Sequence, residues 1–148
     1  ADSRIGFLNI QKAVSSTKEW KKNFDKFKAD FTKEKQRIKL REKKLKKMLD
    51  NLNKTSLVTK PELKKKQENQ FRKEKIDFER YVQDQNAEFG KQEKEMTQKI
   101  LVKMMKIIKK IGEEKKYTMI LEQKVVLYHD KGNDLTSIAT RAYDRENK

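Results

Sequence analysis

The chain has 148 residues, 42% of them charged and 34% apolar, which argues against a single spherical core, because such a core normally needs nearer half apolar residues. The formal net charge of +16 would attract anionic partners such as nucleic acid, acidic lipid headgroups or acidic proteins. The absence of cysteine excludes disulfides, thiolate metal sites and cysteine nucleophiles.

The N-terminal segment predicts one strand and one short connection. Residues 4–10 (RIGFLNI) are apolar and rich in strand formers, so we expect a β-strand there. The connection at residues 9–16 is expected to hold one helical turn around residues 11–14. The first three residues, Ala1-Asp2-Ser3, fit the mature end that a signal peptidase leaves after a small residue.

A long amphipathic helix is predicted for residues 17–53, with Thr17 as its N-cap. Its large apolar residues follow the alternating spacing of four and three that is typical of a coiled coil. Glu34 and Arg41 interrupt that stripe at two expected core positions. The apolar members of the stripe are Trp20, Phe24, Phe27, Phe31, Ile38, Leu45, Met48 and Leu52.

Residues 51–61 form the clearest turn in the sequence, since Asn, Ser and Thr favour turns and caps. Pro61, the only proline, suits the first turn of a new helix, where its missing N–H is not needed. This second helix is expected to run to about residue 116. Its outer part is polar, with Phe71, Phe78, Val82 and Phe89 near heptad positions, and its last part is more apolar. Two long helices joined by a short turn predict an antiparallel hairpin.

The C-terminal part predicts two strands and a helix. Residues 117–122 and 125–129 are short apolar runs separated by Gln123-Lys124, which indicates a β-hairpin. After a turn at residues 130–133, Asp134 is expected to N-cap a final helix at residues 135–146. Three short strands bury little apolar area alone, so an obligate oligomer is favoured over a monomer.

Catalysis is not expected from this sequence. His129 is the only histidine, and we interpret it as a polar end of a strand, because no nucleophile motif accompanies it. One histidine and no cysteine leave only carboxylates as metal ligands, and these lack the spacing of a calcium loop. The four glycines are isolated and form no phosphate-binding loop. We therefore predict no enzyme, no metal and no cofactor.

The positive charge is concentrated around the turn between the long helices. Residues 33–66 hold fourteen Lys or Arg against four Asp or Glu, an excess of ten. Folding of the hairpin would bring these residues together in one cationic tip. This tip is a solvated surface, a site that binds acidic partners, or a group of charges that repels neighbouring tips and keeps them apart. The candidate residues of this tip are Lys43, Lys44, Lys46, Lys47, Lys60, Lys64, Lys65 and Lys66.

The two ends of the chain resemble the Skp (OmpH-like) family of periplasmic chaperones. The opening RIGFLNIQKAV is similar to the family's first strand and its Asn-x-Gln-Lys segment. The close, YTMILEQKVVLYHDKGNDLTSIATRAYD, resembles the family's C-terminal part, with Tyr128 and the helix start Asp134-Leu135-Thr136. The order of elements agrees over the whole length, although the end motifs are short.

This resemblance implies a mainly α fold with a small β element, assembled as a jellyfish-like homotrimer. Residues 1–19 and 106–148 would form a β-rich trimerisation body, and residues 20–105 a helical-hairpin arm with its tip near 50–61. The arms would enclose unfolded outer-membrane β-barrel proteins in the periplasm without ATP, and the tips would approach anionic lipid or acidic client segments. The body residues implied at the trimer contact are Ile5, Phe7, Ile120, Val126 and Tyr128.

Two other functions remain open at this point. A basic coiled coil that binds nucleic acid would fit the charge, but the basic residues are mostly lysine and no nucleic-acid-binding module is recognised. A structural scaffold would fit the long helices, but it would not need two β-segments at its base. A specific nucleic-acid partner is therefore not expected.

Overall fold

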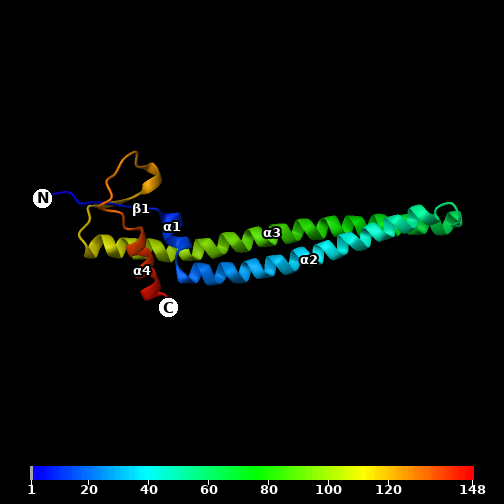
Figure 1. The fold of residues 1–148 in the computed structure, drawn as a ribbon, viewed down its shortest axis with the longest axis horizontal. Helices are drawn as coiled ribbons and strands as arrows, with labels where there is room; N and C mark the ends of the chain where they lie inside the picture. The colour runs from blue at the N-terminus through cyan, green and yellow to red at the C-terminus, as the bar shows by residue number, and fades with distance from the viewer. Residues whose placement is uncertain (1) are drawn as a thin grey trace. The chain divides into compact units, whose positions relative to one another are not determined.

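The computed structural model describes residues 2–148 and confirms a mainly helical chain with a small β element (Figure 1). Ala1, where the sequence predicts a processed N-terminus, lies outside the described residues. The chain divides into two compact units, a first unit of Ala1–Phe27 with Gln92–Lys148 and a second unit of Lys28–Lys91. The elements in chain order are β1 (Ile5–Leu8), α1 (Ile10–Ser15), α2 (Lys18–Thr55), α3 (Pro61–Glu114), β2 (Met119–Glu122), the 3-10 turn η1 (Gln123–Val125) and α4 (Thr136–Glu146).

In the first unit, β1 and β2 form a small two-stranded parallel sheet. The residues of β1 pair with β2 in parallel register, from Ile5 opposite Met119 to Leu8 opposite Glu122. On the other side of β1, the amide of Phe7 donates to the Asn133 carbonyl at 2.8 Å, and the Leu135 amide donates to the Phe7 carbonyl at 2.7 Å. The predicted first strand is confirmed, although it ends at Leu8 because Ile10 already belongs to α1.

The predicted β-hairpin at residues 117–122 and 125–129 is wrong. Only Met119–Glu122 forms a strand, and it pairs with β1 rather than with the segment that follows. Residues 123–125 form the turn η1, and residues 126–129 have no regular structure. Leu127 and Tyr128 are largely exposed, so no apolar face within the single chain holds this segment in a sheet.

Local capping explains how the chain passes from β1 into α2. The Asn9 side chain accepts from the Lys12 amide at 3.0 Å and caps α1, the helical turn predicted near residues 11–14. Thr17 follows, and its Oγ1 donates to the Val14 carbonyl at 2.7 Å and accepts from the Trp20 amide at 3.2 Å. Thr17 is therefore the cap of the long helix, as the sequence predicts.

The core of the first unit lies where the end of α3 meets β1, α1 and α4. Tyr143 and Ala139 from α4 are completely buried, as are Ile100 and Met104 from α3. The expected inner face of α4 is confirmed, because Leu135, Ala139 and Ala142 are buried and Ile138 is partly buried. The start of α4 is held by Asp134, whose Oδ1 accepts from the Thr136 amide at 3.0 Å and from its hydroxyl at 2.6 Å.

In the second unit, α2 and α3 lie side by side and run in opposite directions (Figure 1). The Phe31 and Phe89 rings meet edge to face with centroids 5.4 Å apart, and the Arg41 guanidinium lies 5.9 Å from the Phe78 ring centre. Partners with higher numbers on α2 thus meet lower numbers on α3. Most residues of the predicted apolar stripe are half-buried. Two packed helices cover only part of such large side chains.

Candidate functional site

The structure places the eight lysines of the predicted tip on both sides of the short turn between α2 and α3. Four of them lie in the last turns of α2, Lys60 precedes α3, and three lie in its first turns. All are exposed except Lys64, which is half-buried. Among the described residues, none of the eight forms an ion pair, so their charge faces solvent. Anion binding by these residues stays a prediction.

The same turn carries an apolar feature that the sequence analysis missed. Leu57 and Val58 are 98% and 84% exposed, as much as side chains in an unfolded chain. The sequence shows these two apolar residues between polar turn residues. The composition of the turn alone does not indicate whether their side chains point into the protein or into solvent.

Glu34 and Arg41, which interrupt the apolar stripe, form a polar layer between the helices of the second unit. Glu34 is only 7% exposed, accepts a short hydrogen bond from the Tyr81 hydroxyl and pairs with Arg37 at 3.3 Å. The Arg41 guanidinium stacks 4.5 Å from the centre of the Tyr81 ring. The hydrogen bond from Tyr81 to Glu34 and burial together raise the pKa of the Tyr81 hydroxyl.

We expect this layer to fix the pairing of α2 and α3 rather than to stabilise the unit. Replacing this hydrogen-bonded pair with apolar residues, E34L together with Y81F, should leave the free energy of unfolding unchanged or raise it by about 1 kcal/mol. The single variant E34L should be the less stable of the two, because it removes the acceptor of the Tyr81 hydroxyl. Urea denaturation of both variants checks the order, and a double variant less stable than the single one would contradict it.

The residues expected at an oligomer contact all lie in the first unit, and they differ in how far they are exposed to solvent. Ile5 and Phe7 in β1 and Ile120 in β2 are partly buried, as is Val126. Tyr128 is 85% exposed, and it lies in a loop instead of the predicted strand. The outer edge of β2 has no strand beside it among residues 2–148. The structure thus leaves an apolar loop and a strand edge uncovered in this unit.

His129 has a packing role in the same loop. Its ring stacks on Phe7 with centroids 4.8 Å apart, and its Nδ1 donates to the Asp130 carbonyl at 2.6 Å. Its Nε2 lies 3.3 Å from the Gln123 side-chain nitrogen. No nucleophile stands beside it in these contacts, and among residues 2–148 no cluster of His, Asp and Glu could hold a metal ion.

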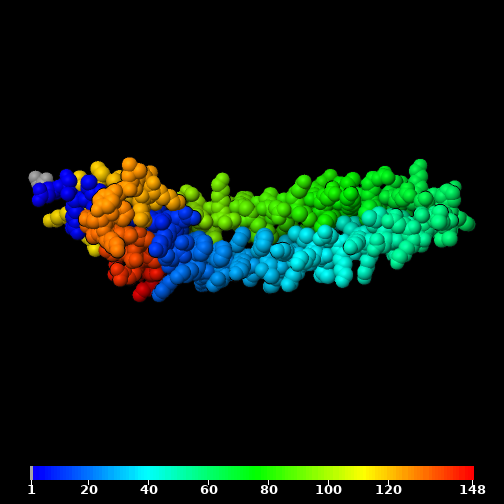
Figure 2. Space-filling view, turned by 45° about the horizontal axis from the view of Figure 1, so that its top comes forward, coloured from blue at the N-terminus to red at the C-terminus, as the bar shows by residue number. Residues whose placement is uncertain are grey.

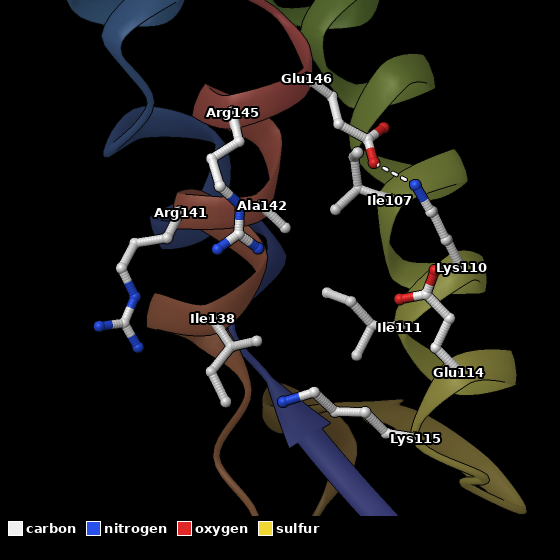
Figure 3. Close-up of a pocket in the computed structure, with 10 residues that line it drawn as sticks. All are labelled: Ile107, Lys110, Ile111, Glu114, Lys115, Ile138, Arg141, Ala142, Arg145 and Glu146. Carbon is white, nitrogen blue, oxygen red and sulfur yellow. Dashed lines mark hydrogen bonds and ion pairs between the residues drawn. The ribbon is translucent and has the colours of Figure 1, made fainter.

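A cavity of about 480 Å³ lies between α3 and α4 in the first unit (Figure 3). Its apolar floor comes from Ile107, Ile111 and Ile138, and basic side chains from both helices surround it. Figure 3 shows Lys110 paired with Glu146, at 2.5 Å, on one side of the cavity. The hydrogen bond to Glu146 raises the pKa of Lys110. The lining contains no serine, threonine, cysteine or histidine.

A second polar network joins α2, α3 and α4 in the first unit. The buried Tyr143 hydroxyl donates a short hydrogen bond to Glu19, and Lys103 pairs with the same carboxylate at 3.1 Å. Burial works to raise the pKa of Glu19, but the hydrogen bonds from Tyr143 and Lys103 outweigh it and lower that pKa. Burial and the bond to Glu19 raise the pKa of Tyr143.

The lowered pKa values of Glu19 and Asp134 predict that low pH destabilises the first unit. The hydrogen bonds from Thr136 lower the pKa of Asp134, so both carboxyl groups have a lower pKa when folded than their ordinary values of 4.5 and 3.8. Their stabilisation is complete above those values and is lost as the pH falls through the lower folded pKa. Thermal unfolding between about pH 6 and about pH 3 should show a smaller loss for E19Q/D134N than for the parent chain. Equal losses would contradict the assignment.

These features describe a mainly helical protein that presents charged and apolar side chains on its surface. The helix pair displays lysines and apolar side chains, and the first unit displays an uncovered apolar loop. The family model of the OmpH-like outer membrane proteins matches residues 4–142, so the chain belongs to the OmpH-like family.

Comparison with solved structures agrees with this assignment. The chain is similar to a crystal structure described as an OmpH-like outer membrane chaperone from Caulobacter crescentus CB15. The TM-score is 0.88, over 99% of this chain and 86% of that chain, at 14% sequence identity, which shows a shared fold. No curated protein sequence matches the chain. Within residues 2–148, no helix has the length and apolar character needed to cross a membrane.

Proposed function

We propose that this chain is an ATP-independent holdase of the periplasm that binds unfolded outer-membrane β-barrel proteins and prevents their aggregation. Its membership of the OmpH-like family supports the envelope setting and the class of client. The observation that carries the proposal is the surface of the second unit, where exposed apolar side chains alternate with many lysines along both helices.

The apolar surface of the second unit suits clients without a fixed shape. Leu40 is 69% exposed and Ile76 47%, and the Phe31 ring is 42% exposed although it contacts Phe89. Such scattered apolar positions offer many weak contacts, which favour varied partners over one specific partner. Release then needs no ATP, because each contact is weak and folding of the client in its membrane is favourable.

The lysines add long-range attraction to these contacts. The excess of ten positive charges at residues 33–66 would draw acidic client segments to the helix pair and raise the association rate. The eight lysines around the turn are the proposed anion-binding residues, and the same field would attract anionic lipid. Salt should weaken this attraction because exposed charges are screened.

Three copies are proposed to assemble through the first unit, which would act as the body, while the helix pair would act as an arm. The uncovered loop and the free edge of β2 support an assembly of this kind. Ile5, Phe7, Ile120, Val126 and Tyr128 are the proposed contact residues. Three arms would then surround a space in which a client is held.

The proposal is tested by diluting a denatured outer-membrane β-barrel protein into buffer with and without this protein and following light scattering. We expect suppression near one trimer per client, weaker at high salt. The variant L40S/I76S should suppress scattering less, because it removes two exposed apolar contacts. Its matched control is Q36S/N69S, which changes exposed polar residues on the same helices and should behave as the parent.

No suppression at several-fold excess would overturn the holdase proposal. Binding to duplex DNA with a steep salt dependence, and no binding to the unfolded client, would instead support a nucleic-acid-binding protein. Equal activity of L40S/I76S and the parent would show that the exposed apolar residues are not the client surface.

A further inference from the structure

In the first unit, α3 and α4 face each other across the cavity of about 480 Å³, and each contributes a stripe of side chains to it (Figure 3). On α3, Ile107 and Ile111 are one turn apart, and Lys115 follows after one more turn. On α4, Ile138 and Arg145 lie two turns apart on one face. Figure 3 shows the Lys115 ammonium near Ile138 and the Arg145 guanidinium toward the other end of α4. The apolar floor therefore has a cationic group at each end. The surface of the whole chain is shown in Figure 2.

The two acidic side chains of the lining lie close to Lys110 and leave the other cations free. Lys110 pairs with Glu146 at 2.5 Å, and Glu114 follows Lys110 by one turn of α3. The hydrogen bond to Glu146 is the main cause that raises the pKa of Lys110, and the charge of Glu114 adds to it. Within residues 2–148, neither Arg145 nor the Lys115 ammonium forms an ion pair. The free charge of the cavity is therefore positive.

The backbone that carries these two cations is held in place. Nη1 of Arg4 donates to the Lys115 carbonyl at 2.7 Å, and the Lys115 amide donates to the Ile111 carbonyl at 2.9 Å. On α4, Tyr143 is completely buried in the core two residues before Arg145. The cavity volume lies within the range of about 300 to 1,000 Å³ that is typical of ligand sites. The cavity is thus formed in advance of any ligand.

We propose that this cavity binds the carboxyl-terminal end of a polypeptide whose last residue has a large apolar side chain. The Arg145 guanidinium would hold the terminal carboxylate through two parallel hydrogen bonds, because its planar fork matches a carboxylate. The apolar side chain would lie on Ile111 and Ile138, and Lys115 would add a second positive charge at the other end of the floor. The inference goes beyond the holdase proposal, which concerns the second unit, and does not depend on it.

The lining favours the end of a peptide over a fatty acid or an internal acidic segment. Six of the ten lining residues are charged and four are apolar, so a long acyl chain would lie mostly against charged groups. A peptide also brings amide N–H groups, which the Glu114 carboxylate, directed toward the cavity in Figure 3, can accept. A terminal carboxylate and its apolar side chain share one Cα, whereas an internal acidic side chain holds its carboxylate farther from the apolar side chain of a neighbour.

Isothermal titration calorimetry of the full chain with short synthetic peptides tests the proposal. The first probe is a hexapeptide of glycine and serine that ends in leucine and has a free carboxyl group. We expect the same peptide with a carboxyl-terminal amide to bind about tenfold more weakly, because the charged hydrogen bonds to Arg145 are lost. A peptide that ends in glycine should also bind about tenfold more weakly, because it buries no side chain on the floor.

Variants of the chain then locate the site. R145Q should weaken binding of the leucine peptide about tenfold, and K115Q about twofold, because Lys115 acts only through its charge. The matched control is R141Q, which removes the same charge from α4, although the Arg141 guanidinium points away from α3 in Figure 3. This control should bind the peptide as the parent does. All three positions are exposed, so circular dichroism should show unchanged helices.

The outcomes distinguish this proposal from its alternatives. No binding of the leucine peptide, or equal binding of its acid and amide forms, would overturn it. Equal losses in R145Q and R141Q would overturn it as well, because the general charge of +16 would then explain the binding. Binding of decanoate without binding of the peptide would overturn it in favour of a fatty acid. We expect R145Q to suppress client aggregation as the parent does, so failure of peptide binding leaves the holdase proposal standing.

Discussion

The variant G6A is expected to lower the free energy of unfolding of the first unit by about 2 kcal/mol. A Cβ at position 6 would lie 2.6 Å from Cδ1 of Leu135 and 3.2 Å from the Tyr117 ring. Leu135 is 2% exposed, so its methyl group has no free space to turn into. β1 cannot shift easily either, because hydrogen bonds hold it to β2 on one side and to residues 133–135 on the other.

Urea denaturation followed by circular dichroism, with hydrogen exchange to locate the affected residues, measures this effect. G90A is the matched control, because a Cβ at Gly90 would meet nothing within 4 Å and Gly90 lies inside α3. That variant should raise stability by about 1 kcal/mol, since alanine favours a helix over glycine. An unchanged denaturation midpoint for G6A would show that Leu135 or β1 relaxes more freely than its burial indicates.

The long helices could be predicted from the sequence because their signals are local and repeated. The spacing of large apolar residues on α2 recurs over many turns, and Thr17 and Pro61 mark where α2 and α3 begin. Glu34 and Arg41 sit on the same spacing, yet the sequence alone could not show that Tyr81 would partner both. Tyr81 lies on α3, and the spacing of hydrophobic residues does not indicate which polar side chains on two helices will pair.

The strands could be predicted only in part, because their partners are distant in sequence. Residues 125–129 have strand-forming side chains and follow a strand closely, so a local hairpin was the natural expectation. The structure instead pairs β2 with β1, more than a hundred residues earlier, in parallel register. Strand propensity describes a fit to a half-buried surface, and the single chain provides no such surface for Leu127 and Tyr128.

The candidate binding surfaces also have one feature that the sequence predicts and one that it does not. The lysines around the turn are visible in the composition of residues 33–66, because charge adds up along the chain. The exposure of Leu57 and Val58 is not visible there, because a leucine in a turn can point inward or outward. In the structure both side chains are exposed, in a turn where the Thr55 carbonyl accepts from the Val58 and Thr59 amides. The exposure of these apolar side chains therefore depends on the backbone conformation of the turn, which the amino-acid composition does not describe.

The variant L127D is expected to convert the proposed trimer into monomers. Val125, Leu127 and Tyr128 are 74%, 105% and 85% exposed in the single chain, so three large apolar side chains close together in the sequence face solvent. Such a surface on a soluble chain usually marks an interface. A carboxylate placed there would be buried without a partner in the trimer, and three copies of it would repel one another near the symmetry axis or at each contact.

Sedimentation velocity of the parent and of L127D measures the change directly, and circular dichroism shows whether α2 and α3 remain. The control K131D places the same carboxylate four residues further along, on an exposed polar position of the loop, and should sediment as the parent does. A trimer that persists in L127D would place the contact on the free edge of β2 instead of on this loop. A parent chain that sediments as a monomer would remove the trimer from the proposal, because the exposed loop would then have no second copy to cover it.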